Sequence, residues 1–133
     1  MSAADESIIR YRLERASETL GEARSLAATG HWNGCANRLY YACFYALVAL
    51  LHRRQLPTRK HTGVRALFNQ HFVKPRLIAA DLGDFYNDLF DTRHEADYED
   101  LVCLTEEDVG PWIAEAERFV EALTVLTTSL GEA

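Results

Sequence analysis

The chain has 133 residues, of which 48% are hydrophobic and 26% charged, and its formal net charge is −6. This is the composition of a globular protein, so it excludes disordered and fibrous classes, and the length predicts one domain over residues 1–133. Three cysteines without metal-ligand spacing predict reduced thiols, which pack as small hydrophobic side chains. The polar N-terminal residues lack the pattern of a signal peptide, so we expect a cytoplasmic protein.

The first predicted helix begins at the polar N-terminus and ends at Thr29 and Gly30. Ser2 and Asp5 have the spacing of a capping box, and glycine is favoured just past a helix end. Apolar residues at steps of three and four give it one inward stripe, made of Ile9, Leu13, Ala16, Leu20, Ala23 and Ala27. The short turn that follows predicts a second helix antiparallel to the first.

The second predicted helix, about residues 32–54, is apolar nearly all round. A helix of this kind is usually buried or spans a membrane. Its apolar run from Ala36 to Leu51 falls short of the about 20 residues that a span needs, so we expect no membrane. We therefore expect it to be the central helix of a soluble bundle, ended by the segment around Pro57.

The next stretch predicts a short helix, about residues 60–72, and a longer one, about residues 77–98. Pro75 either interrupts the pattern between them or is the first residue of the longer helix. The apolar stripe of the longer helix contains Leu82, Tyr86 and Leu89, and continuing it reaches Arg93 and Asp97. A separate row of acidic residues on this helix favours a solvated face or a docking surface over a metal site, so we expect no metal and no cofactor.

The last predicted helix begins near Thr105, whose spacing to Asp108 is again that of a capping box. Pro111 fits if the regular helix begins only at about Asp108, because its missing N–H is tolerated in the first turn. The inward face is predicted to contain Val109, Trp112, Ala116, Val120, Leu123 and Leu130. The sequence thus predicts an all-α fold, an antiparallel up-and-down bundle of four main helices plus a short connecting helix.

Charge is distributed unevenly along the chain. No acidic residue lies between Glu22 and Asp81, and that interval contains nine lysines and arginines. One interpretation is a polyanion-binding surface, with its candidate residues Arg53, Arg54, Arg59, Lys60 and His61 joined by His52. The other is that the basic interval complements the acidic helices of the same fold or of a second subunit. Both interpretations remain open.

The chemistry-bearing candidates are the pair Asn37 and Arg38 and the segment from Arg93 to Tyr98. Two arginines near helix ends, with tyrosine hydroxyls, can hold the phosphate of a nucleotide or RNA. The alternative is a buried polar cluster in which Asp97 pairs with both arginines and fixes the second helix against the fourth. The candidate ligand-binding residues are Asn37, Arg38, Tyr41, Arg93, Asp97 and Tyr98.

These segments resemble the HEPN family, and specifically the short prokaryotic proteins encoded beside a small nucleotidyltransferase. The resemblance rests on Asn37-Arg38-Leu39-Tyr40-Tyr41-Ala42, on Lys60-His61-Thr62-Gly63 and on Arg93-His94-Glu95-Ala96-Asp97-Tyr98. It implies a helical bundle that is commonly dimeric. It also implies a toxin-like or substrate-binding role in a two-component system with the nucleotidyltransferase as partner.

The resemblance further implies a metal-independent ribonuclease site in which an arginine is followed by a histidine, with four to six residues between them. Arg93 matches that arginine and is the one candidate catalytic residue, but Tyr98, Glu99 and Asp100 occupy the places of the histidine. Without it, acid–base chemistry near neutral pH lacks its natural group. We therefore expect little ribonuclease activity and favour binding of a nucleotide, an RNA or a partner protein. A dimeric endoribonuclease and a purely structural interaction module are the alternatives.

Overall fold

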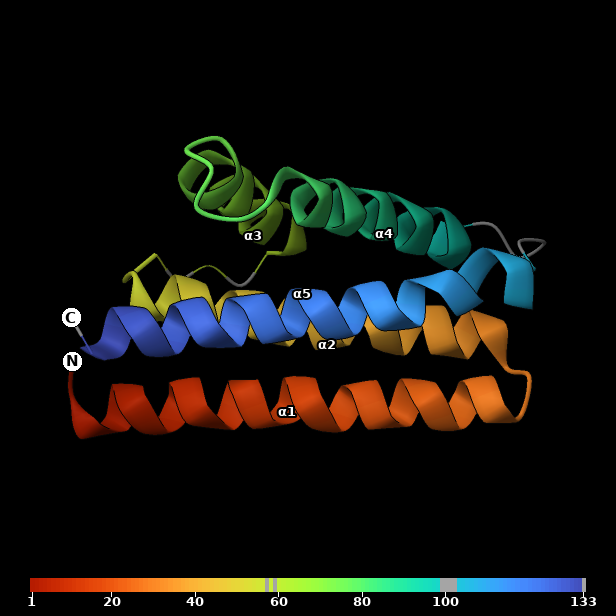
Figure 1. The fold of residues 1–133 in the computed structure, drawn as a ribbon, viewed down its shortest axis with the longest axis horizontal. Helices are drawn as coiled ribbons and strands as arrows, with labels where there is room; N and C mark the ends of the chain where they lie inside the picture. Colours follow the sequence, from red (N-terminus) through yellow and green to blue (C-terminus); the bar gives the residue numbers. More distant parts are fainter. Residues whose placement is uncertain (57, 59, 99–102, 133) are drawn as a thin grey trace.

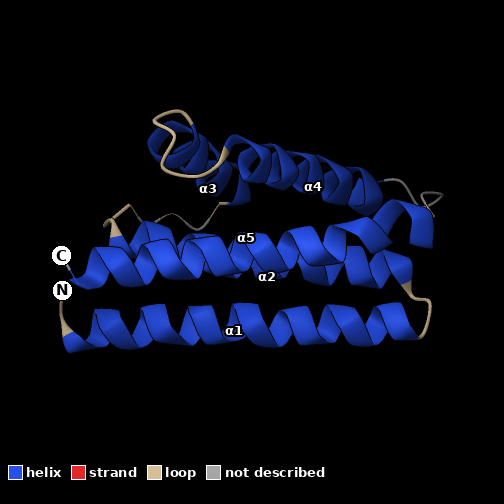
Figure 2. Cartoon of the chain, viewed as in Figure 1, coloured by secondary structure: helices blue, strands red, loops and turns tan. Residues whose placement is uncertain are grey.

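The structure, a computed structural model, describes residues 1–56, 58, 60–98 and 103–132, and of residues 94–98 it describes the backbone only. Within these ranges the chain is helical apart from its turns and caps (Figure 2). The elements are α1 (Ala3–Ala28), α2 (Trp32–Arg53), α3 (His61–Phe68), the single π-helical turn η1 (Asn69–Val73), α4 (Ala80–Tyr98) and α5 (Glu106–Glu132). The predicted all-α bundle of four main helices plus a short connecting helix is confirmed.

The predicted boundaries of α1 are also confirmed, and local chemistry explains them. At its start the Ser2 hydroxyl accepts a hydrogen bond from the Asp5 N–H at 3.1 Å, and the Asp5 carboxylate accepts one from the Ser2 N–H at 3.2 Å. This capping box satisfies two backbone N–H groups that would otherwise lack a partner. At the other end Gly30 adopts φ 75°, a left-handed conformation that favours glycine.

Helix α2 is the central element of the bundle. Leu39, Cys43 and Leu47 are fully buried, and α1, α3, α4 and α5 all pack against this helix. With its polar ends included, α2 reaches 22 residues, so by length and composition alone it could cross a membrane, and the expectation that it falls short is wrong. Of its most apolar stretch, 61% is buried inside the protein, which is the pattern of a core helix.

Two of the three cysteines behave as predicted. Cys35 and Cys43 are free and buried, and burial raises the pKa of both thiols because it disfavours the thiolate. Cys103 is also free, but it is exposed. The first two therefore pack as small hydrophobic side chains, whereas Cys103 does not.

The helices define two distinct ends of the molecule (Figure 1). At one end, the termini end, α1 begins, α2 ends at Arg53 and α5 finishes. At the other, the turn end, α1 leads into α2 through the turn at Gly30, and α4 finishes where α5 begins. Helices α1, α2 and α5 run alongside one another, while α3 and α4 lie over them. The turn end therefore brings together the first turns of α2 and the last turns of α4, which are far apart in the sequence.

Two helix starts differ from the prediction. Helix α4 begins at Ala80 rather than near residue 77, because Arg76 adopts φ 63° and the chain turns there before the helix starts. Pro75 lies in this turn and does not open the helix. Helix α5 begins at Glu106, directly after the Thr105 cap, so Pro111 lies in its second turn rather than its first. The capping box therefore sets the start of α5 despite the proline.

Candidate functional site

Two arginines from different helices meet at one tyrosine ring at the turn end. The guanidinium carbon of Arg38, on α2, lies 5.1 Å from the centre of the Tyr41 ring. That of Arg93, on α4, lies 5.1 Å from the same ring and 5.1 Å from the ring of Tyr40. Arg93 also donates a hydrogen bond from Nη2 to the Tyr41 hydroxyl at 2.8 Å. The structure thus brings Arg38, Tyr41 and Arg93 together, as the sequence predicts.

The side chain of Arg38 is fixed mainly by a neutral partner. Its Nε and Nη2 donate to the amide oxygen of Asn37 at 3.1 and 2.8 Å. Its Nη1 reaches the Glu22 carboxylate at 3.5 Å, and the other oxygen of that carboxylate lies 3.8 Å from Arg15. Because Asn37 is uncharged and Glu22 is shared, the positive charge of Arg38 is only weakly compensated by these groups.

A cavity of about 250 Å³ adjoins this cluster, between the start of α2 and the end of α4. Its polar wall includes Asn33, Asn37, Thr92 and Arg93, and Leu89 and Leu104 contribute apolar surface. The Asn33 side chain accepts a hydrogen bond from the backbone N–H of Leu104 at 2.7 Å, which ties the segment before α5 to α2. Drug-sized pockets are about 300–1,000 Å³, so this cavity suits a group the size of a phosphate or a ribose.

His61 also lies at this cluster, a placement that the sequence pattern does not predict. Its ring stacks on Phe44 with centroids 4.2 Å apart and lies edge-on to Tyr41 at 5.8 Å. Its Nδ1 is 2.8 Å from the hydroxyl of Tyr40, whose pKa is raised by burial. The sequence groups His61 with the basic residues of its own segment, but α3 places it against the two rings that Arg93 covers.

The other members of the predicted polyanion-binding surface do not gather in one place. Arg53 is 10% exposed, binds the Glu6 carboxylate with both terminal nitrogens and donates from Nε to the Thr127 carbonyl at 3.1 Å. His52 pairs with Asp5 at 2.8 Å. For Arg53 and His52 these contacts favour the other interpretation, in which basic residues of the interval complement acidic residues of the same fold.

The remaining three members of that set lie elsewhere or cannot be placed. Arg54 covers the ring of Phe72 at 5.2 Å, and Lys60 is exposed at the start of α3. Arg59 lies outside the described residues. The side chains of Asp97 and Tyr98 also lie outside the description, so the predicted pairing of Asp97 with the two arginines stays a prediction. The backbone places positions 97 and 98 about one turn beyond Arg93 on α4.

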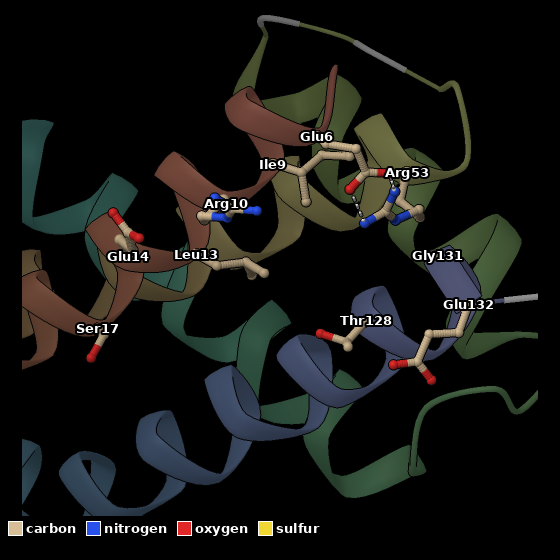
Figure 3. Close-up of a pocket in the computed structure, with 10 residues that line it drawn as sticks. All are labelled: Glu6, Ile9, Arg10, Leu13, Glu14, Ser17, Arg53, Thr128, Gly131 and Glu132. Atoms are coloured by element: carbon tan, nitrogen blue, oxygen red, sulfur yellow. Dashed lines mark hydrogen bonds and ion pairs between the residues drawn. The ribbon is translucent and has the colours of Figure 1, made fainter. Parts of the chain in front are cut away.

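A larger cavity than the one beside the cluster, about 460 Å³, is at the termini end. Figure 3 shows Glu6 and Arg53 directed toward each other at one edge, with Thr128 of α5 across the opening from Leu13 of α1. The Glu6 pKa is lowered by its hydrogen bonds from Arg53, which keep the carboxylate charged. This cavity contains none of the candidate ligand-binding residues, and its most buried cation already has a carboxylate partner.

Comparison with known proteins adds independent information on this architecture. The family model described as the HEPN domain matches residues 9–126. A UPF0332 protein of Thermotoga maritima is 42% identical over 128 residues, which cover 96% of this chain and 97% of that protein. Two proteins of Methanocaldococcus jannaschii, both named as candidate toxins, are also similar. One is 33% identical, and the match covers 86% of this chain and 85% of that protein. The other is 27% identical, and the match covers 72% of this chain and 65% of that protein.

Proposed function

We propose a function for this chain from the premise that it belongs to the HEPN family. In this proposal it is the toxin-like component of a cytoplasmic two-component system whose other component is a small nucleotidyltransferase. It binds the phosphate of a nucleotide or RNA through Arg38, Tyr41 and Arg93. The observation that carries the proposal is the convergence of two guanidinium groups on the Tyr41 ring, each 5.1 Å from its centre.

Three features of the cluster support an anion site. Guanidinium groups present planar arrays of donors that match phosphate oxygens, and aromatic rings below them hold the planes in place. The Tyr41 hydroxyl adds a further polar group beside Arg93. The adjoining cavity of about 250 Å³ provides room for a phosphate or a sugar. Candidate-toxin names among the similar proteins favour the toxin-like role.

The site is tested by measuring how tightly two arginine-to-lysine variants bind the ligand. Arg93→Lys keeps the charge but removes the planar fork, so binding of a ribonucleoside monophosphate should weaken by about tenfold or more. Arg118→Lys is the matched control, because Arg118 is 61% exposed and lies on α5, paired with Asp81. Calorimetric titration measures the dissociation constants, and circular dichroism confirms that both variants fold.

Two outcomes would contradict the anion site. If wild-type protein binds neither a nucleotide nor RNA and Arg93→Ala lowers the stability of the fold, the cluster is a structural lock and the chain a protein-interaction module. If ligand binds but Arg93→Lys and Arg118→Lys behave alike, the ligand is held elsewhere. A ligand-dependent rise in melting temperature that disappears in Arg93→Lys supports the proposal.

A second candidate function, metal-independent endoribonuclease, is favoured by the position of His61. This histidine contacts the rings of Tyr40 and Tyr41, on which Arg93 lies, and so brings an imidazole close to the candidate catalytic arginine. Imidazole is the side chain best suited to acid–base catalysis near neutral pH. RNA cleavage in the presence of EDTA, lost in both His61→Asn and Arg93→Lys, would establish this function. Absence of cleavage by folded wild-type protein would exclude it and leave binding as the role of the cluster.

The partners of the proposal are a second copy of the chain and the nucleotidyltransferase. Light scattering coupled to size-exclusion chromatography should give the mass of a homodimer. Co-expression with the neighbouring gene, where that gene encodes a small nucleotidyltransferase, should yield a complex that survives gel filtration. A monomer at micromolar concentration would contradict the dimer, and separate elution would contradict the partnership.

A further inference from the structure

A second groove with arginine and tyrosine walls lies between α1 and α2. It has a volume of about 300 Å³, and Tyr11, Arg12 and Arg15 line it from α1, facing Phe44, Tyr45 and Val48 of α2. Tyr11 is 62% exposed, one of the most exposed large side chains among the described residues. We call this feature the arginine–tyrosine groove. No candidate ligand-binding residue of the sequence analysis lies in it.

The groove lies next to the Arg38–Tyr41–Arg93 cluster along α2. Arg38, Tyr41, Tyr45 and Val48 follow one another on α2 at steps of three and four, so they occupy one face of the helix. The rings of Tyr41 and Tyr45 are 6.1 Å apart. Arg15 lies 5.3 Å from the Tyr45 ring, just as Arg38 lies 5.1 Å from the Tyr41 ring. The same pairing of arginine with tyrosine is therefore repeated one turn along α2.

The arginines of the groove are held by contacts that a phosphate can replace. Arg15 binds Glu18 at 3.1 Å and approaches Glu22 at 3.8 Å, and the two carboxylate side chains are 63% and 46% exposed. Arg12 lies 3.3 Å from Nδ1 of His52, a neutral partner unless the ring is protonated. Arg15 itself is 26% exposed, but the exposed carboxylates are screened by solvent, so exchanging one of them for a phosphate should cost the fold little.

We propose that the arginine–tyrosine groove binds the base and phosphate of a neighbouring nucleotide, so that the ligand of the Arg38–Tyr41–Arg93 cluster is a single-stranded oligoribonucleotide and not a mononucleotide. The inference rests on the proposed function of that cluster. Tyr11 and Tyr45 offer ring surfaces on which a base stacks, while Arg12 and Arg15 meet the backbone. Aromatic platforms along a positively charged groove are the means by which proteins hold single strands irrespective of sequence.

An acidic peptide is the competing occupant, and the groove fits it less well. A peptide carboxylate would use the arginines but would leave the exposed ring of Tyr11 without a planar partner. A strand uses both, because each nucleotide carries a base and a phosphate. The repeat of arginine with tyrosine at Tyr41 and Tyr45 matches a ligand that repeats in the same way.

The test compares ligands of two lengths on variants of the two sites. Fluorescence anisotropy gives the affinity for a labelled single strand of about eight ribonucleotides. Calorimetry gives the affinity for a ribonucleoside monophosphate. Tyr11→Ala should weaken binding of the strand by about fivefold or more and leave the monophosphate unchanged. Tyr11→Phe, which keeps the ring, should bind like wild type.

The charge contribution is tested by salt dependence. Arg12→Gln should reduce the slope of log affinity against log salt by about one for the strand. Arg24→Gln is the matched control, because Arg24 is on the same helix, is 53% exposed and pairs with Glu117 away from the groove. A polyglutamate peptide should not displace the strand at equal charge concentration.

The outcomes separate this inference from the proposed function. If the monophosphate binds and the strand binds no more tightly, the groove proposal is overturned but the proposal for the cluster is retained. The same holds if Tyr11→Ala binds the strand as tightly as wild type. If the strand binds and depends on Tyr11 and Arg12 but not on Arg93, the cluster proposal fails and the groove stands. Displacement by polyglutamate would identify an acidic protein segment as the occupant and would overturn the groove proposal.

Discussion

The two ends of the bundle use arginine in opposite ways. At the termini end, Arg53 is 10% exposed, and its donors go to the Glu6 carboxylate and the Thr127 carbonyl. At the turn end, Arg38 lies over the Tyr41 ring and donates chiefly to the neutral amide of Asn37. A guanidinium matched by a bidentate carboxylate is neutralised and joins helices, whereas Arg38, whose carboxylate partner Glu22 is 3.5 Å away and shared with Arg15, is less fully compensated. A run of basic residues in the sequence is therefore a poor guide to the position of a binding surface.

Removing Arg53 should have the largest effect on stability. Arg53→Ala deletes hydrogen bonds that join α2 to α1 and α5, so the free energy of unfolding should fall by about 2 kcal/mol. Urea denaturation measures the loss, and oligonucleotide binding by the folded variant should be unchanged. Arg54→Ala is the neighbouring control and should cost less than about 1 kcal/mol, because Arg54 is exposed and covers one ring. Equal losses would remove the distinction between the two ends.

A methyl group added at Gly131 of α5 tests how firmly Glu6 and Thr127 hold Arg53. Its Cβ would lie 2.8 Å from the Arg53 guanidinium, which cannot move freely because Glu6 and Thr127 hold it. Gly131→Ala should therefore destabilise the protein by about 1 kcal/mol. Gly21→Ala, where the nearest atom is 3.9 Å away, should instead stabilise α1 by up to about 1 kcal/mol through helix propensity. Thermal unfolding of both variants gives the two signs, and a gain at Gly131 would mean that Arg53 is not fixed.

Arg38 should show the reverse behaviour of Arg53. Arg38→Gln removes a cation that is 29% exposed from the Tyr41 ring and leaves the Asn37 amide without a close donor, so stability should change by less than about 1 kcal/mol. Affinity for a ribonucleoside monophosphate should fall by about tenfold, as measured by calorimetry. A large loss of stability with unchanged binding would place Arg38 in a structural lock like that of Arg53.

The smallest effect concerns acid stability at the termini end. Hydrogen bonds with His52 and then with Ser2 lower the pKa of Asp5 to about 2 from an ordinary value of 3.8. A pKa lowered by folding contributes stability above the unfolded value, and that contribution is lost as pH falls toward the folded value. The difference in melting temperature between wild type and Asp5→Asn should thus be constant above pH 4 and shrink toward pH 2. A difference that grows on acidification would contradict the assignment.

Much of the fold could be predicted from the sequence because its signals are local. Ser2 with Asp5 and Thr105 with Asp108 mark two helix starts by side-chain spacing alone, and Gly30 marks an end. The apolar stripes could be predicted equally well, since one helix turn brings residues three and four apart to the same face. The start of α4 was not, because the left-handed backbone at Arg76 depends on how η1 closes.

The candidate site also contains residues that the sequence predicts and residues that it does not. Asn37 and Arg38 are neighbours in sequence, and Arg93 continues an apolar stripe, so their importance could be inferred from position. His61 could not be placed, because its contacts with Tyr40 and Phe44 join α3 to α2 across the core. The separation of Arg53 from the other basic residues could not be predicted either, because it depends on Glu6 of another helix.

By itself, the sequence determined the helices, the central position of α2 and the two arginine-bearing segments, because each of these follows from spacing along one helix. Only the tertiary structure decided which carboxylates, carbonyls and aromatic rings these cations meet. The physical reason is that a guanidinium finds its partners in space. Glu6 reaches Arg53 from 47 residues away, and Arg93 reaches Tyr41 from 52 residues away.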